Sequence, residues 1–81
     1  MATSTAAPYL ALLSEKDLSL KSFALKSIND VVDELWSEIA NNILEIEELY
    51  EDESFKERKL AALIASKVYY NLADYDSSVK F

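Results

Sequence analysis

The side chains best suited to chemistry in this sequence are carboxylates, which cluster between Glu45 and Glu57. Clustered carboxylates can bind calcium, and a spaced pair can hydrolyse glycosides. A calcium loop of the EF-hand type needs oxygen ligands at alternate positions and a glycine at the sharp turn. The run that starts at Glu51 places Phe55 and Lys56 where a ligand and that turn belong. We therefore predict a solvated helix face and loop in this region, without a metal site.

A second candidate is the serine pair in Asp76-Ser77-Ser78. This segment resembles the Asp-Ser-Leu turn of acyl-carrier proteins, which are short, acidic and helical and carry a modified serine there. The leucine is missing, and the segment lies near the end of the sequence. We expect an ordinary helix start at these residues. A small acidic helical carrier or regulatory domain is the alternative functional hypothesis, and it would require a modifiable serine.

Missing residue types restrict the chemistry further. The sequence contains no Cys and no His, so disulfides, thiolates and the most common general base and metal ligand are absent. It contains no Gly either, which excludes a glycine-rich nucleotide loop. We accordingly predict that the chain is not an enzyme and that it has no catalytic residue and no cofactor.

The charge balance points to the class of partner. Fifteen Asp and Glu against eight Lys and Arg give a net charge of -7. A polyanion such as nucleic acid is repelled by this charge, and anionic membranes recruit Lys and Arg clusters instead. No apolar stretch approaches the roughly 20 residues that span a bilayer. We therefore predict a soluble chain with no nucleic-acid partner and no membrane partner, and we expect its partners to be proteins.

The elements that hold these residues are predicted to be helices, because the only Pro is Pro8 and glycine turns are absent. A first helix is expected to open near Ser4 or Thr5, with Pro8 in its first turn. Apolar residues at helical spacing predict a second helix from Leu18 to about Ile39, capped by Asp17 or Ser19 and bent near residues 29–32. Asn41 and Asn42 are its expected boundary.

Three further helices follow in this prediction. The third carries Ile43, Ile46 and Leu49 on its apolar face. Ser54 and Glu57 have the spacing of a capping box, so the fourth helix is expected to begin at about Phe55. After residues 71–74, a short fifth helix would carry Tyr75, Val79 and Phe81. The predicted fold is all-α, with stacked antiparallel helices that form the start of an α-solenoid of about four helices plus a truncated fifth.

Aromatic residues are the candidates for protein contacts, because they supply large areas at interfaces. These candidates are Trp36, Tyr69, Tyr70, Tyr75 and Phe81. The favoured interpretation of the tyrosines and Phe81 is that they pack the fourth helix against the fifth, with Tyr69 or Tyr70 turned outward. Trp36 is interpreted first as a core residue and second as a contact residue.

The region from Leu60 to Phe81 resembles the junction of a tetratricopeptide-type hairpin, with Ala73 in place of the usual glycine. A resemblance over the whole chain is more specific. It is carried by Thr5-Ala6-Ala7-Pro8, Leu10-Ala11-Leu12-Leu13, Ala24-Leu25, Ser27-Ile28-Asn29, Val31-Val32-Asp33, Leu35-Trp36-Ser37-Glu38-Ile39, Ile46-Glu47, Leu49-Tyr50 and residues 61–72. These runs resemble the N-terminus of the largest non-ATPase subunits of the proteasome regulatory particle base, the family of second regulatory-particle non-ATPase subunits.

That resemblance implies a much longer protein, with a helical rod, a toroid of helical repeats and a C-terminal region that docks a ubiquitin receptor. Residues 1–81 would be the N-terminal fragment of the rod. The implied function is a non-catalytic scaffold in ubiquitin-dependent protein degradation, located in the cytoplasm and nucleus. The implied partners are proteasome lid and base subunits and the remainder of the same chain. The face of Tyr75, Val79 and Phe81 is expected to lack its cover, so residues 1–81 alone should self-associate or bind downstream helices.

Overall fold

The structure is a computed structural model that describes residues 5–79, and side chains as far as residue 76. Its helices are α1 (Ala7–Leu12), α2 (Leu18–Ala40), α3 (Ile43–Glu51) and α4 (Arg58–Val79). No strand occurs within residues 5–79, so the all-α prediction is confirmed. Over the same residues, no helix has both the length and the apolar character needed to cross a membrane.

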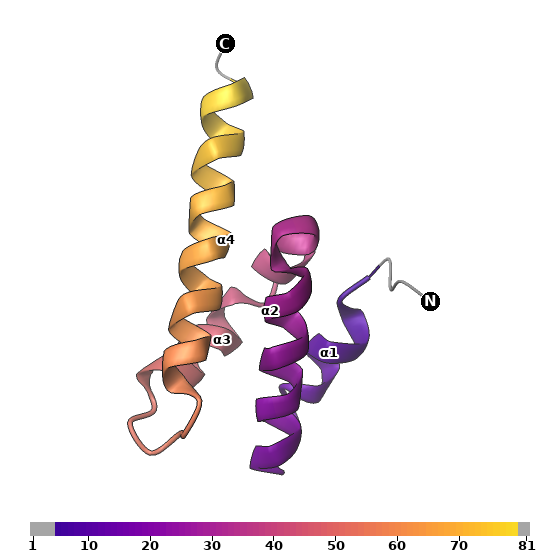
Figure 1. Ribbon diagram of the computed structural model, residues 1–81, viewed down its shortest axis with the longest axis vertical. Helices are drawn as coiled ribbons and strands as arrows, with labels where there is room; N and C mark the ends of the chain where they lie inside the picture. The colour runs from indigo at the N-terminus through magenta and orange to yellow at the C-terminus, as the bar shows by residue number, and fades with distance from the viewer. Residues whose placement is uncertain (1–4, 80–81) are drawn as a thin grey trace.

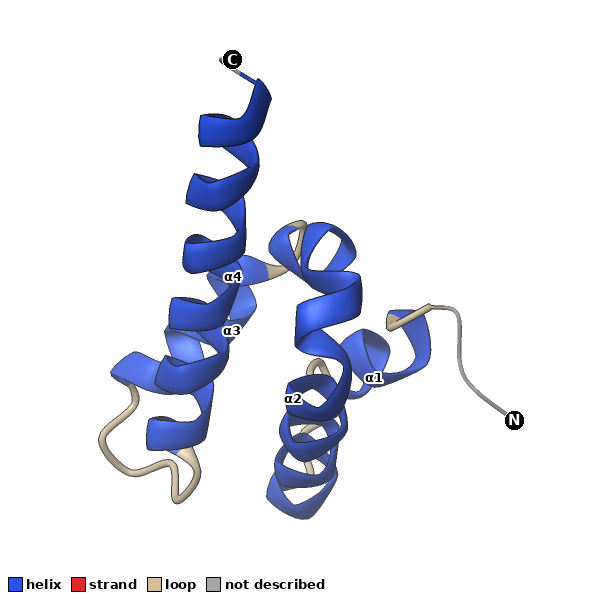
Figure 2. Ribbon diagram, turned by 45° about the horizontal axis from the view of Figure 1, so that its top comes forward, coloured by secondary structure: helices blue, strands red, loops and turns tan. Residues whose placement is uncertain are grey.

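The helices form two successive pairs that lie side by side (Figures 1 and 2). α2 packs against both α1 and α4, and α3 packs against α4. α2 and α4 run in the same direction, while α3 leads the chain back toward the start of α4. Such stacking of helix pairs is how an α-solenoid begins, as the sequence predicted.

The predicted fifth helix is wrong as a separate element, because α4 continues without a break through residues 71–74. Asn71 does not end the helix, since its Nδ2 donates to the carbonyl oxygen of Lys67 at 2.8 Å within the same helix. The hairpin glycine is replaced by Ala73, and alanine has the highest helix propensity of all residues. The local sequence therefore favours one long helix.

Two aspartates close the turns that precede α2 and α4. Asp17 Oδ1 accepts the Ser19 backbone N–H at 2.9 Å, which confirms Asp17 as the N-cap of α2. The capping box at Ser54 and Glu57 is wrong, because the Ser54 hydroxyl donates to Asp52 Oδ1 at 2.6 Å. The helix then begins at Arg58 and not at Phe55. Hydrogen bonds from Ser19 and Ser54 lower the pKa of Asp17 and Asp52 respectively.

Two local features differ from the prediction in position. The bend in α2 lies at Leu35, with φ −116° and ψ 22°, and not at residues 29–32. The start of α1 depends on Glu38 of α2, whose Oε1 accepts the Ala6 N–H at 2.8 Å and the Thr5 hydroxyl. Thr5 Oγ1 also accepts the Ala7 N–H at 3.1 Å, and Pro8 lies in the first turn as predicted. Ser4 lies outside the described residues.

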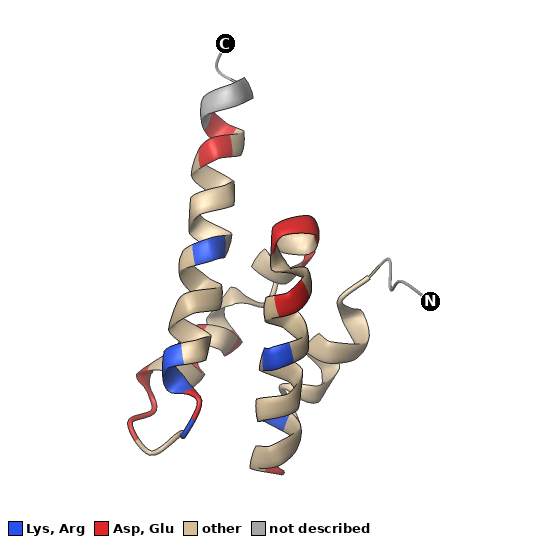
Figure 3. Cartoon of the chain, viewed as in Figure 1, with Lys and Arg blue, Asp and Glu red and all other residues tan. Residues whose placement is uncertain are grey.

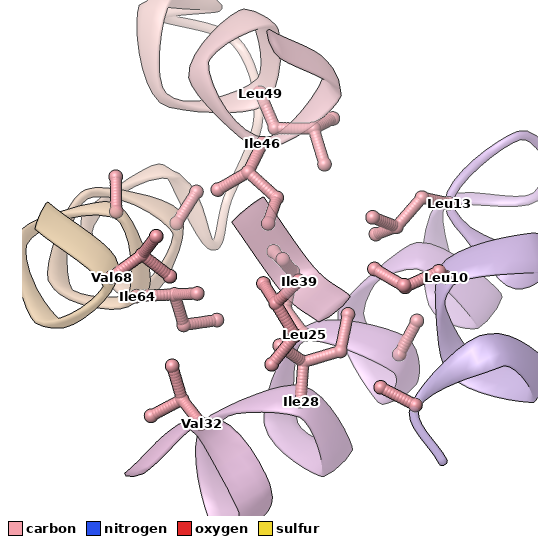
Figure 4. Packing of buried hydrophobic residues seen from close by; sticks show 14 of the residues in the cluster. Leu10, Leu13, Leu25, Ile28, Val32, Ile39, Ile46, Leu49, Ile64 and Val68 are labelled. Atoms are coloured by element: carbon pink, nitrogen blue, oxygen red, sulfur yellow. The ribbon is translucent and has the colours of Figure 1, made fainter. Parts of the chain in front are cut away.

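One apolar core joins the four helices (Figure 4). Its largest fully buried side chains are Leu25, Ile28, Val32, Ile39, Ile46, Ile64 and Val68. No polar or charged residue is buried among the described ones. Burial of one such side chain stabilises the fold by about 1.5–3 kcal/mol, so these contacts dominate its stability.

This core predicts a graded response at Ile64, which is fully buried. Ile64→Ala should lower the free energy of unfolding by about 2–5 kcal/mol, and Ile64→Val by about 0.5–1.5 kcal/mol, because each deletion leaves a cavity. Urea unfolding followed by circular dichroism measures both. Leu44→Ala, at a side chain 74% exposed, is the control. An Ile64→Ala effect no larger than that of Leu44→Ala would contradict the placement of the core.

Candidate protein-contact surface

The apolar stripe of α4 extends beyond the core. Ile64 and Val68 are buried, and Leu72 and Tyr75 follow on the same side of the helix after steps of four and three residues. Leu72 is nevertheless 37% exposed and Tyr75 53% exposed. The last turns of α4 project past the ends of α2 and α3, as Figures 1 and 2 show. We call residues 72–76 the projecting end of α4.

Trp36 meets this projecting end from α2. Its ring centroid lies 6.0 Å from that of Tyr75, with an angle of 56° between the ring planes. Tilted aromatic pairs at this separation attract each other, because the positive edge of one ring approaches the negative face of the other. Trp36 is only partly buried and packs against the core, as its first interpretation predicted. Its role in a contact with a partner stays a prediction.

Tyr69 and Tyr70 point in different directions, because neighbouring positions on a helix are about 100° apart. The Tyr69 hydroxyl donates to Glu47 Oε1 of α3 at 2.9 Å, which ties α4 to α3. Tyr70 is 74% exposed, so it is the residue that turns outward. Phe81 lies outside the described residues. Packing of a fourth helix against a fifth through these tyrosines is wrong, because Tyr69, Tyr70 and Tyr75 all lie on α4.

The candidate contact residues therefore do not form one patch. The structure brings Trp36 and Tyr75 together, and it places Tyr69 beside α3. Sequence reasoning did not foresee Leu72 as part of the half-exposed stripe, although its spacing from Val68 was visible. It also missed Lys67, whose Nζ donates to Asn29 Oδ1 of α2 at 2.9 Å.

Three of the acidic residues between Glu45 and Glu57 make hydrogen bonds within the fold. Glu45 Oε1 accepts from Asn42 Nδ2 at 3.0 Å, Glu47 accepts from Tyr69, and Asp52 accepts from Ser54. Among the described residues, no group of three acidic side chains is arranged to hold a metal ion. These carboxylates act at helix ends and between helices.

The serine segment considered for a carrier lies within α4, because that helix runs to Val79. The predicted helix start at Asp76-Ser77-Ser78 is therefore wrong. A turn that would present a serine for modification does not form at this point of the described chain. The carrier hypothesis gains no support from this backbone.

Residues 3–81 match the family described as the 26S proteasome subunit RPN2, N-terminal domain. The chain belongs to this family. The resemblance noted in the sequence is thus confirmed, and it covers nearly every residue.

Relatives in several organisms are similar over the same region. The chain is 60% identical to the 26S proteasome regulatory subunit RPN2 of Saccharomyces cerevisiae over all of its 81 residues, which are 9% of that protein. It is 49% identical to rpn2 of Schizosaccharomyces pombe over 89% of the chain and 8% of the relative. It is 44% identical to the 26S proteasome non-ATPase regulatory subunit 1 of Drosophila melanogaster over its whole length, again 8% of the relative.

The contact between Tyr69 and Glu47 predicts a measurable titration. The hydrogen bond to Glu47 raises the pKa of Tyr69 above its ordinary value of 10.0, because the neutral hydroxyl can donate and the phenolate would face a carboxylate. Since the folded pKa is the higher one, this stabilisation is present below about pH 10 and is lost as pH rises through the folded value. Glu47→Gln should lower the Tyr69 pKa.

Carbon-13 NMR of ring-labelled tyrosines measures this pKa directly. Tyr70→Phe is the control, because Tyr70 points away from Glu47 and its loss should leave the titration of Tyr69 unchanged. An unchanged Tyr69 pKa in the Glu47→Gln variant would show that the hydrogen bond is not formed in solution.

Proposed function

We propose that this chain is a non-catalytic scaffold segment of the 26S proteasome regulatory particle, and that it positions other subunits through protein contacts in ubiquitin-dependent protein degradation. Membership in the RPN2 N-terminal domain family carries this proposal. The names of its relatives describe regulatory subunits of the 26S proteasome. The function of a scaffold is geometric, because it holds surfaces at fixed separations and makes or breaks no bond.

The residues support a non-catalytic role. Cys and His are missing from the sequence, so the usual nucleophile and general base are not available. The carboxylates of Glu38, Glu45 and Glu47 accept hydrogen bonds at helix starts or between helices. The buried side chains of the core are apolar and closely packed, so they keep the helices at fixed positions.

The proposed partners are lid and base subunits of the regulatory particle and the remainder of the same polypeptide, in the cytoplasm and nucleus. The chain spans 8–9% of the relatives, which leaves most of such a subunit outside residues 1–81. We assign these residues to the start of a helical rod that precedes a repeat toroid and a C-terminal region. The half-exposed stripe at the projecting end of α4 would receive the next helices, because stacked repeats bury their cores against neighbours.

A full-length subunit with Leu72→Ala and Tyr75→Ala tests this proposal. Truncation of well-buried contact residues weakens an interface by about 2 kcal/mol or more, about 30-fold in affinity. We expect less of the variant subunit in regulatory particles isolated by affinity purification, as measured by native gels and quantitative mass spectrometry. Asp74→Asn, at an exposed position between the two, is the matched control.

Thermal unfolding of the purified full-length subunit identifies which neighbour covers the projecting end. Lower stability of the double variant points to the remainder of the same chain, and unchanged stability with reduced incorporation points to another subunit. Both results agree with a scaffold. Wild-type stability together with wild-type incorporation would contradict the role proposed for this surface.

A further inference from the structure

A second surface lies at the opposite end of α4, where the start of α2 faces the turn between α3 and α4. A groove of about 520 Å³ opens there. Its walls come from two segments that are distant in sequence. They are Leu18, Ser19, Ser22, Phe23 and Lys26 of α2, and Ser54, Phe55, Lys56 and Glu57 of the turn.

The groove exposes large apolar side chains that folding does not use. Leu18 is 60% exposed and Phe23 is 55% exposed, whereas the adjacent Ala24 and Leu25 are fully buried in the core. Phe55 is 3% exposed and anchors the turn to the core. The groove therefore has a fixed wall opposite two apolar side chains that remain available for contact.

The residues that line this groove carry a net charge of +1, with Lys26 and Lys56 against Glu57, whereas the whole chain is acidic. Residues 18–29 of α2 contain Lys21 and Lys26 and no acidic residue, although the chain carries a net charge of -7. Residues 30–40 reverse this pattern, with four acidic residues and no basic one. Figure 3 shows basic residues along the first half of α2 and at the start of α4, and acidic residues toward the far ends of both helices and in the turn before α4.

The lysines of the groove are available to a partner. Lys26 and Lys56 both line it and are exposed, with Glu57 as the one acidic lining residue. The nearby carboxylates of Asp17 and Asp52 stay negatively charged, but hydrogen bonds from Ser19 and Ser54 hold them at the two turns, and neither lines the groove. Two cations beside an apolar wall favour a ligand that combines carboxylates with bulky apolar side chains.

We propose that this groove binds an amphipathic helix of another protein, which places apolar side chains against Leu18 and Phe23 and carboxylates beside Lys26 and Lys56. This mode, an apolar helix face in an apolar groove, is a recurring form of peptide recognition. The proposal deepens the scaffold function, on which it rests, by naming the chemistry of a partner at a surface remote from the projecting end of α4.

A second copy of this chain is a poorer occupant. Its own acidic amphipathic face lies on α3, where Leu44 is 74% exposed near Glu48 and Glu51. Insertion of α3 into the groove of another copy would join two different surfaces. Such head-to-tail contacts extend into open chains of copies unless the rotation closes a ring. A different protein satisfies the same chemistry without this consequence.

Fluorescence anisotropy with the purified full-length subunit tests the proposal. The probes are two labelled helical peptides of about 16 residues, or about 24 Å, that share one leucine face and carry either Glu or Lys on the other face. We expect the Glu peptide to bind more tightly. Lys26→Glu with Lys56→Glu should weaken binding of the Glu peptide about tenfold. This loss should be largest in buffer of low salt, where the charges are screened least.

The controls separate charge from shape and from folding. Lys59→Glu makes the same kind of charge change at an exposed residue of α4 that does not line the groove, and it should leave binding of the Glu peptide unchanged. Phe23→Ser should weaken the binding of both peptides, because it removes the apolar contact with their leucine face. Circular dichroism should show wild-type helix content in each variant, since all four positions are exposed.

Three outcomes overturn the proposal. In the first, the Lys peptide binds as tightly as the Glu peptide. In the second, the Lys26/Lys56 variant binds the Glu peptide as tightly as the Lys59 variant does. In the third, light scattering shows that the wild-type subunit self-associates and that Phe23→Ser abolishes this self-association. The last outcome would assign the groove to a second copy. Incorporation of the Leu72/Tyr75 variant into regulatory particles is a separate measurement, so failure at the groove leaves the scaffold proposal standing, and the reverse also holds.

A photo-crosslinking amino acid in place of Phe23, in subunits assembled into the regulatory particle, then identifies the natural occupant. We expect crosslinks to a helical peptide of another subunit in which acidic residues flank bulky apolar ones. Crosslinks confined to the subunit's own polypeptide, or to a segment without acidic residues, would contradict the proposed partner. The same amino acid in place of Tyr70 is the control for general surface labelling.

Discussion

The packing of α2 against α4 is the constraint on which the rest of this structure depends. Val32 of α2 and Ile64 and Val68 of α4 are almost completely buried and lie close together in the core (Figure 4). Each of the other helices attaches to one member of this pair, α1 to α2 and α3 to α4. Branched side chains have few rotamers, so such a contact fixes the helices with little loss of side-chain entropy.

The lengths of the helices then determine which surfaces remain open. α3 has 9 residues and α2 has 23, which correspond to about 14 Å and about 35 Å of helix. α3 therefore returns the chain only part of the way along α2. As a result, α4 begins beyond the start of α2 and projects past its end. One mismatch thus produces both surfaces. The projecting end of α4 loses its cover beyond the core, and the start of α2 faces only the turn before α4.

Local patterns were sufficient to predict α2 and α3. Apolar spacing placed α2 and α3 correctly, Asp17 was identified as a cap, and Asn41 and Asn42 lie between the two helices as expected. Glu38 shows where such reasoning stops, because it accepts a hydrogen bond from Ala6, 32 residues away. The groove has the same origin, since tertiary packing alone brings Phe23 near Lys56.

Errors occurred where two local signals competed. Ser54 and Glu57 match a capping box, but Asp52 Oδ1 accepts both the backbone N–H and the hydroxyl of Ser54 and so forms a turn of its own. Asn71 can end a helix, yet its side chain bonds within α4, and the Ala73 that follows prolongs the helix. The sequence identified aromatic side chains as candidate contact residues. It did not indicate where α2 and α3 end relative to α4, and this determines how much of Tyr75 is covered.

Segregated charge gives this small layer of helices a direction. The projecting end of α4 carries Asp74 and Asp76 beside its apolar stripe, whereas the groove carries Lys26 and Lys56 beside its own. Two apolar surfaces of similar character would otherwise accept each other's partners. A partner whose charge has the same sign as the surface is repelled, and specific interfaces use such repulsion as well as attraction. If the groove and the projecting end of α4 bind as proposed, the lysines of the one and the aspartates of the other would orient what assembles around α2 and α4.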